Sequence, residues 1–359
     1  MDFDPTSTLC ATGSADSTIK VWDVDKGFAT HNLKGHKGVI ATVKFHPNKR
    51  RIRLVSGSDD GQMRLWDLES RKYVYAVDVW TWLTRPTLYA FLERHRCIAV
   101  LDTHVSVIRA LDVTPDGRYL LAGARDKIMT VWDTSTTPLQ HIQTIPVYES
   151  VEAAGFLLPG APLPNNTRVA SNQLIAYSAG EKGILQLWDV NKNECIYAQT
   201  NSKDAKHTII DVIQYVTRDH EHRLVAVTSD YNLLFFHLPN LKIQIKQIAG
   251  YNDEVIDLVF AGPEGNHLVV ATNSEQLRVY DLNDGSVDVV YGHSDVVICV
   301  DVFGNDVLAT GGKDGVGLIW KMRPGDKTVA LTERLVLLLD EPLFRNQRGL
   351  APTQISQSS

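Results

Sequence analysis

The sequence predicts an all-β protein made of seven repeats of one four-stranded unit, and three observations support this prediction. Aromatic residues recur along the chain at near-regular intervals. Each follows a short run in which apolar and polar residues alternate, as in residues 18–24 (TIKVWDV), which is typical of a strand with one buried face. Clusters of glycine, aspartate and proline separate these runs and indicate turns.

The same short motif surrounds the aromatic residue of every repeat. The seven aromatic anchors are Trp22, Trp66, Trp132, Trp188, Phe236, Tyr280 and Trp320. Successive anchors are between 40 and 66 residues apart, which fits a unit of about 40 to 45 residues with insertions in two repeats. A unit of this length is typical of a four-stranded blade, so the expected architecture is a β-propeller.

From residue 1 to about residue 322 the repeats resemble those of the WD40-repeat family. Residues 1–5 (MDFDP) align with residues 43–47 (VKFHP), so we expect an incomplete first blade without the Gly-His segment that precedes the inner strand elsewhere. Residues 323–359 are expected to be a tail outside the propeller. This tail lends at most one outer strand, through residues 328–331, and its polar end is expected to be disordered.

The resemblance implies a hydrogen-bonded tetrad inside a blade. An aspartate in a turn orients a histidine ring, and a serine or threonine hydroxyl lies between that ring and the anchor tryptophan, whose indole N–H donates a hydrogen bond. The complete tetrads are His36, Ser56, Asp60 and Trp66, and His293, Thr310, Asp314 and Trp320. The partial ones are Thr12, Asp16 and Trp22, and His104, Asp126 and Trp132, the latter with Ala122 in the hydroxyl position. Repeats four to six have largely lost the tetrad.

Residues 145–156 (IPVYESVEAAGF) depart from the pattern, because Val147 stands where other repeats have the tetrad histidine. Two interpretations are open. Repeat proteins tolerate degenerate units because the neighbouring units supply burial. Alternatively, Tyr148, Glu149 and Ser150 lie on a loop between blades and form part of a partner-binding surface.

Three irregular segments, residues 144–157, 249–257 and 292–303, carry a closer resemblance. They are similar to the transducin beta-like WD-repeat subunit of the small-subunit processome, which belongs to the UtpB subcomplex on the U3 small nucleolar RNA-associated pre-ribosome. The resemblance implies a non-enzymatic scaffold in pre-rRNA processing and 40S ribosome biogenesis, located in the nucleolus. The implied partners are the other WD-repeat subunits of UtpB, with pre-rRNA or U3 small nucleolar RNA contacted through the complex.

The excess length between Trp66 and Trp132 suggests an insertion. An outer-strand pattern occurs twice there, in residues 71–77 (RKYVYAV) and 96–104 (RCIAVLDTH), and removing residues 73–96 restores a spacing of 42 residues. Codons for Lys-Tyr-Val can contain a splice donor, so we hypothesise that residues 73–96 are a retained intron translated in frame. The alternative is a genuine inserted arm with exposed aromatic residues. Residues 158–173, rich in Pro and Asn, are predicted to form a surface loop.

Charge and cysteine content limit the classes of function that we expect for this chain. The formal net charge is -6, which argues against nucleic-acid binding through bulk charge. The densest basic cluster is a candidate RNA contact, with a solvated hairpin as the alternative; it consists of Lys49, Arg50, Arg51 and Arg53. The four cysteines are far apart, which predicts reduced thiols in the cytosol or nucleus. The sequence shows neither a secretory signal nor a membrane-spanning run.

The motifs of hydrolases and nucleotide-binding enzymes are missing from the sequence: it has no G-x-S-x-G, no phosphate-binding loop and no paired carboxylates. We therefore expect no enzymatic activity, no cofactor or metal, and neither a membrane nor a small-molecule substrate as partner. The rival function is a generic WD-repeat adaptor, such as a substrate receptor of a ubiquitin ligase or a signalling scaffold similar to a G-protein beta subunit.

Overall fold

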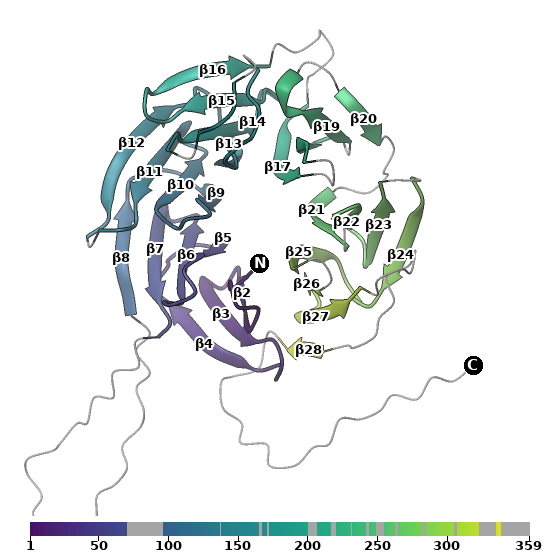
Figure 1. The fold of residues 1–359 in the computed structure, drawn as a ribbon. Helices are drawn as coiled ribbons and strands as arrows, with labels where there is room; N and C mark the ends of the chain where they lie inside the picture. The colour runs from purple at the N-terminus through teal and green to yellow at the C-terminus, as the bar shows by residue number, and fades with distance from the viewer. Residues whose placement is uncertain are drawn as a thin grey trace, which may run out of the picture.

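The computed structural model is a ring of antiparallel sheets arranged around a common centre (Figure 1). The structure describes residues 1–69, 96–136, 138–164, 167–170, 172–199, 207–216, 220–230, 232–241, 244–248, 255–262, 265–282, 285–304, 307–322 and 335–338. Within these residues there are seven sheets of four strands, each with its strands in chain order. The all-β propeller with seven repeats is therefore confirmed.

The first three blades contain the most regular repeats. Blade 1 is formed by β1 (Asp2–Phe3), β2 (Leu9–Gly13), β3 (Thr18–Asp23) and β4 (Ala29–Lys34). Blade 2 is formed by β5 (Ile40–Phe45), β6 (Arg53–Ser58), β7 (Gln62–Asp67) and β8 (Arg96–Asp102). Blade 3 is formed by β9 (Ile108–Val113), β10 (Tyr119–Ala124), β11 (Ile128–Asp133) and β12 (Gln140–Pro146). The first blade thus has all four strands, although its inner strand has only two residues.

The degenerate repeats form blades of the same kind. Blade 4 comprises β13 (Val151–Phe156), β14 (Ile175–Gly180), β15 (Gln186–Asp189) and β16 (Glu194–Ala198). Blade 5 comprises β17 (Ile209–Val216), β18 (His222–Thr228), β19 (Leu233–His237) and β20 (Gln244–Ile248), with the 3-10 turn η1 (Leu238–Asn240) after β19. Blade 6 comprises β21 (Val255–Ala261), β22 (His267–Thr272), β23 (Gln276–Asp281) and β24 (Val287–Tyr291). Blade 7 comprises β25 (Val297–Phe303), β26 (Val307–Gly312), β27 (Val316–Lys321) and β28 (Leu335–Leu338).

All seven aromatic anchors lie on the third strand of their blade and are buried. The alternation in the sequence explains this placement: in β3, Ile19 and Val21 are fully buried and Lys20 between them is not. The core is divided into clusters between neighbouring sheets, and one of them joins residues of blade 1 to residues of blade 2, including Trp66. Each blade is therefore stabilised by apolar burial against its neighbours.

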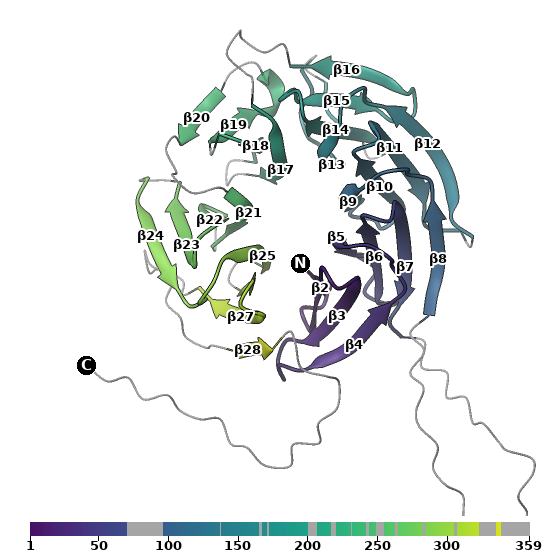
Figure 2. The same ribbon diagram turned by 180° about the vertical axis from the view of Figure 1, so that it is seen from behind.

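The ring is closed at its centre. The first strand of each blade contacts the first strand of the next, and β25 of blade 7 contacts β1 of blade 1. Seen from behind, the first strands again lie innermost and the fourth strands lie at the rim (Figure 2). Each of the seven sheets consists of four strands that are consecutive among the described residues, so none of these sheets combines strands from both ends of the chain.

The structure adds detail to two sequence predictions about connecting segments. The outer strand of blade 7 is β28, residues 335–338, and its ladder to β27 uses the most apolar run of the tail; the predicted residues 328–331 lie outside the described residues. Residues 158–173 connect β13 to β14 as a loop with exposed residues such as Pro159 and Arg168, but Ala161, Leu163 and Val169 within it are buried in the cluster between blades 4 and 5. The three apolar side chains explain this burial, because proline and asparagine around them supply turns without preventing contact with the core.

The predicted insertion lies largely outside the described residues, which stop at residue 69 and resume at residue 96. Its two ends are nonetheless placed, because Asp67 of β7 pairs directly with Arg96 of β8. The outer strand of blade 2 is therefore the second of the two patterns, in residues 96–102, as the sequence favoured.

Candidate functional site

The tetrad of blade 2 joins three elements of one sheet. The indole Nε1 of Trp66 on β7 donates to Ser56 Oγ on β6 at 2.9 Å, and Ser56 Oγ lies 2.7 Å from His36 Nε2. His36 Nδ1 lies 2.9 Å from Asp60 Oδ2, in the turn between β6 and β7. Since the serine hydroxyl accepts from the indole, it can donate to Nε2, which leaves the Nδ1 proton for the carboxylate.

The electrostatics of this tetrad favour a neutral histidine. Burial lowers the pKa of His36 despite the neighbouring carboxylate. Burial alone would raise the pKa of Asp60, but hydrogen bonds from the Lys37 amide, from His36 and from the Gln62 amide outweigh it, and the pKa is lowered. The pair is thus a hydrogen bond between a neutral ring and an ionised carboxylate, which stabilises the blade without requiring a buried charge on the ring.

Blade 7 has the same geometry with threonine as the bridge. Trp320 Nε1 donates to Thr310 Oγ1 at 2.8 Å, and His293 Nε2 lies 2.8 Å from the same oxygen. His293 Nδ1 lies 3.1 Å from Asp314 Oδ2. In blade 1 the structure places Trp22 Nε1 3.0 Å from Thr12 Oγ1, while Asp16 accepts from the Thr18 amide within its own turn.

Blade 3 contains a residue that sequence reasoning missed. Ala122 occupies the hydroxyl position, so the network was expected to be partial, but Thr130 supplies the oxygen from the neighbouring strand. Trp132 Nε1 donates to Thr130 Oγ1 at 3.2 Å, and His104 Nε2 lies 3.1 Å from it. Thr130 pairs with Ala122 in the β10–β11 ladder, so the hydroxyl reaches the same place across the strands. This register could have pointed to Thr130 beforehand.

In blade 4 an acidic residue replaces the missing histidine and aspartate. Val147 is buried, and Glu149 Oε2 accepts from the Lys182 amide at 2.9 Å. In blade 2 the equivalent residue is Gly38, whose position approaches the Asp60 amide so closely that an added Cβ would lie 2.8 Å from it. In blade 2 the carboxylate of Asp60 accepts a hydrogen bond within its own turn, from the Gln62 amide. In blade 4 the carboxylate that binds the corresponding turn comes from the loop before the first strand, from Glu149.

This arrangement corrects the predicted partner surface. Glu149 is only 2% exposed, and burial raises the pKa of its carboxyl group. It therefore cannot be offered to a partner as the sequence suggested. Tyr148 is 71% exposed and has a positive φ of 64°, and Ser150 is half-buried beside Glu152, which pairs with Arg109 and Arg125 of blade 3. Of the three candidates, only Tyr148 presents a fully exposed side chain.

The basic cluster is divided by the fold. Lys49, Arg50 and Arg51 are exposed in the turn between β5 and β6, whereas Arg53 begins β6 and is half-buried. This turn follows the end of the first strand of blade 2, and Tyr148 precedes the beginning of the first strand of blade 4. The two candidate surfaces therefore lie on opposite faces of the ring.

Carboxylates on the first strands link neighbouring blades. Each of four aspartates accepts a hydrogen bond from a backbone amide of the next first strand. The pairs are Asp301 with Phe3, Asp2 with Phe45, Asp112 with Phe156, and Asp257 with Val300. Burial, followed by the charge of Asp2, raises the pKa of Asp301 to about 7. Burial, followed by the charge of Asp257, raises the pKa of Asp211 on β17 to about 7.

Over the described ranges, no three His, Cys, Asp or Glu side chains gather in a way that could hold a metal ion. Among the same residues, no helix combines the length and apolarity that a membrane span requires.

Comparisons with known proteins support the sequence interpretation. The family model described as "WD domain, G-beta repeat" matches residues 1–23, 27–67 and 95–133. The chain is 36% identical over 335 residues to bovine (Bos taurus) transducin beta-like protein 3, and 35% identical over 335 residues to the human (Homo sapiens) protein of that name. It is 30% identical over 347 residues to U3 small nucleolar RNA-associated protein 13 of Saccharomyces cerevisiae. The resemblance predicted from the irregular segments is confirmed.

The similarity covers most of this chain and a smaller part of each relative. The alignments span 93% of the chain for the bovine protein and 89% for the yeast protein, but only 38% of either relative. The match to the repeat model breaks off after residue 67, where β7 ends, and resumes at residue 95, one residue before β8 begins.

Proposed function

We propose that this chain, which is a WD40-repeat β-propeller, is a non-enzymatic scaffold subunit acting in ribosome biogenesis. The finer proposal is a role in the small-subunit processome, in the nucleolus, where it takes part in pre-rRNA processing and 40S assembly. Its proposed partners are the other WD-repeat subunits of UtpB, with pre-rRNA or U3 small nucleolar RNA reached through the complex.

One observation carries this proposal: the similarity to the specific relatives extends through the degenerate blades. The general repeat model matches only within residues 1–133, whereas the alignments to the transducin beta-like proteins and to the U3 small nucleolar RNA-associated protein cover about nine tenths of the chain. A generic repeat similarity would favour the regular blades. Similarity that includes blades without a complete tetrad supports a shared role, because those blades are the least constrained by the common pattern.

The mechanism proposed is geometric. A closed ring of seven sheets holds its loops at fixed positions on two faces, so one subunit can bind several partners around a nascent RNA. The exposed Tyr148 loop on one face is a candidate protein contact, and the Lys49–Arg51 turn on the other is a candidate RNA contact. The side chains of the tetrads and of the first-strand aspartates form hydrogen bonds within and between blades. The loops are therefore the parts of the ring that we propose bind partners.

Affinity purification of the tagged full-length chain from nuclear extract tests this proposal. We expect UtpB subunits in the eluate by mass spectrometry, and U3 small nucleolar RNA by hybridisation, each at least tenfold above an unrelated tagged propeller. Depletion of the protein should cause precursors of the small-subunit rRNA to accumulate. An eluate with cullin or G-protein components and without U3 RNA would instead support the rival adaptor function.

A further inference from the structure

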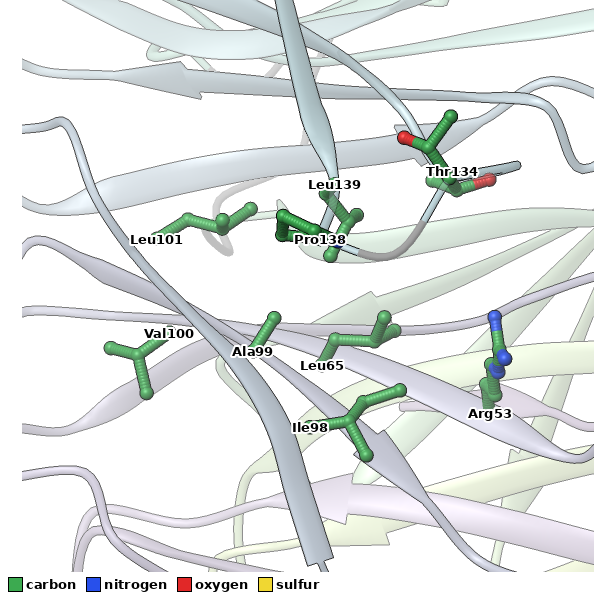
Figure 3. A pocket seen from close by; sticks show the side chains of 10 residues that line it. Arg53, Leu65, Ile98, Ala99, Val100, Leu101, Thr134, Pro138 and Leu139 are labelled. Atoms are coloured by element: carbon green, nitrogen blue, oxygen red, sulfur yellow. The ribbon is translucent and has the colours of Figure 1, made fainter.

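A pocket of about 390 Å³ opens between blades 2 and 3, away from the loops considered so far. Its floor is formed by the sheet of blade 2, with Leu65 of β7 and residues 98–101 of β8. Its opposite wall is formed by Thr134, Thr136, Pro138 and Leu139, which follow β11. Figure 3 shows Pro138 and Leu139 facing these apolar side chains across the pocket. The walls therefore suit an apolar group.

One end of the pocket carries a positive charge without a counterion. Figure 3 places Arg53 there, below Thr134 and apart from the apolar end formed by Val100 and Leu101. The Nε atom of Arg53 is buried and has no hydrogen-bond partner among the described residues, and no described carboxylate lies within ion-pair distance of its guanidinium. A buried guanidinium nitrogen without a partner is costly, and an anionic group in the pocket would satisfy it.

The neighbouring strand adds a backbone surface. β8 is the last strand in the sheet of blade 2, so its outer edge has no strand partner among the described residues, and Val100 on it is 48% exposed. An extended peptide that adds to such an edge gains main-chain hydrogen bonds, and its alternate side chains point to one side about 7 Å apart. Arg53 lies on β6, two strands inside this edge, so its guanidinium is reached by a side chain that enters the pocket over β7 and β8.

We propose that this pocket binds an extended segment of a partner protein in which a bulky apolar residue is followed two positions later by an aspartate or glutamate. The apolar side chain packs against Leu65, Leu101 and Leu139, and the carboxylate pairs with the Arg53 guanidinium. The exposed Lys49, Arg50 and Arg51 of the adjoining turn favour the approach of an acidic segment. RNA fits less well, because most of the lining is apolar and only Arg53, Thr134 and Thr136 offer polar groups to ribose or phosphate.

Selection from a phage library of random dodecapeptides tests the proposal, with the full chain as bait. We expect enrichment of apolar residues spaced two positions before an acidic residue. Bound peptides, measured by fluorescence anisotropy, should lose at least tenfold in affinity on Arg53→Gln and on Val100→Asp, which places a carboxylate at the exposed mouth. The matched control is Arg51→Gln, which removes the same charge from the exposed turn and should change affinity less than twofold.

Several outcomes would overturn the assignment. Selected peptides that bind Arg53→Gln as tightly as the wild type, or a selection without the apolar-acidic spacing, would contradict it. If a uridine-rich RNA decamer displaces the peptides and depends on Arg53 more than on Arg51, the pocket binds RNA. If Arg53→Gln, but not Arg51→Gln, abolishes self-association in sedimentation, the occupant is a second copy of the chain. The inference rests on the pocket alone, so its failure would leave the proposed function untouched.

Discussion

At Thr130 one hydroxyl group completes a network that the blade would otherwise lack. Thr130 is 1% exposed and bonds both Trp132 Nε1 and His104 Nε2. Thr130→Val keeps the volume but leaves both nitrogens without their partner, so we expect a loss of about 1 to 3 kcal/mol in the free energy of unfolding, measured by chemical denaturation.

The cross-strand geometry provides a rescue for this substitution. Ala122 pairs with Thr130 and corresponds to Ser56 of blade 2, so Ala122→Ser in the Thr130→Val background should restore at least half of the lost stability. A single substitution that costs under about 0.5 kcal/mol, or a double variant no more stable than the single one, would show that the bridge is energetically unimportant.

Asp211 predicts a stability that depends on pH. Its pKa is raised to about 7 by burial and then by the charge of Asp257, with Arg109 acting in the opposite direction. Because the folded pKa lies above the unfolded value of 3.8, the contribution of Asp211 to stability is complete below pH 3.8 and is lost as the pH rises through 7. Because asparagine does not ionise, Asp211→Asn should remove this decrease in stability with rising pH.

We therefore expect the stability difference between Asp211→Asn and the wild type to increase by about 1 to 2 kcal/mol from pH 5 to pH 8, less than the full shift implies because the residue is partly exposed. All other ionisable groups are common to the two proteins, so their contributions cancel in this difference. Asp25→Asn, at an exposed aspartate, is the matched control. A difference that stays constant across this range would exclude a raised pKa at Asp211.

At the scale of the strand and turn, the sequence predicted the features that recur in every repeat. It did not predict the contacts in which a residue from one element takes the place of a residue from another. The anchors on the third strands could be read from alternation and spacing alone, because each third strand repeats the same pattern of buried residues. The repeat pattern alone did not identify Thr130 or Glu149, because each reaches its partner from a strand or loop other than the one that the pattern assigns; for Thr130 the cross-strand register supplies the missing signal. The spacing of residues along the chain predicts where a residue lies within its own strand. The contacts of Thr130 and Glu149 depend instead on how neighbouring strands and loops are aligned.

The basic turn between β5 and β6 leads to a prediction about RNA. Replacing Lys49, Arg50 and Arg51 with glutamate reverses three exposed charges, and we expect the affinity for a structured pre-rRNA fragment to fall at least tenfold at moderate salt and its salt dependence to weaken. Filter binding of the purified chain measures both. A triple variant that binds RNA as the wild type does, and remains on pre-ribosomes in sucrose gradients, would leave a solvated hairpin as the role of this turn.

The hairpin between β7 and β8 makes the insertion testable. Deleting residues 73–96 removes Arg96, the first residue of β8, and joins Lys72 to Cys97, so Lys72 takes the place of Arg96 opposite Asp67 and a short connection replaces a long one. Loop-closure entropy then favours the shortened chain by up to about 1.5 kcal/mol, so we expect it to unfold at a slightly higher denaturant concentration. Loss of folding in the deletion variant would assign the segment a structural role, and transcripts that retain the segment as their only form would contradict the retained-intron hypothesis.

At the scale of the whole molecule, the boundary between blades 7 and 1 differs from the other boundaries. Within the chain, neighbouring blades are joined by a short connection, as between β12 and β13, which keeps separated sheets close and favours their return. Between blades 7 and 1 the contacts are noncovalent. The Phe3 amide donates to Asp301 at 2.9 Å, the rings of Phe3 and Phe303 are 6.2 Å apart, and Phe3, Cys10 and Ala309 form a small buried cluster.

This difference predicts where the ring opens first. Asp301→Ala removes the acceptor of the Phe3 amide, and Asp112→Ala removes the equivalent acceptor of the Phe156 amide between blades 3 and 4. In native-state hydrogen exchange followed by mass spectrometry, we expect Asp301→Ala to accelerate exchange at least tenfold across β1, β2 and β25, because the separated sheets have no direct tether. Asp112→Ala should accelerate exchange less than threefold, and only near β13. If the two substitutions accelerate exchange equally and only near the substituted residue, the prediction is wrong. Side-chain packing would then stabilise the boundary between blades 7 and 1 as well as a covalent connection stabilises the other boundaries.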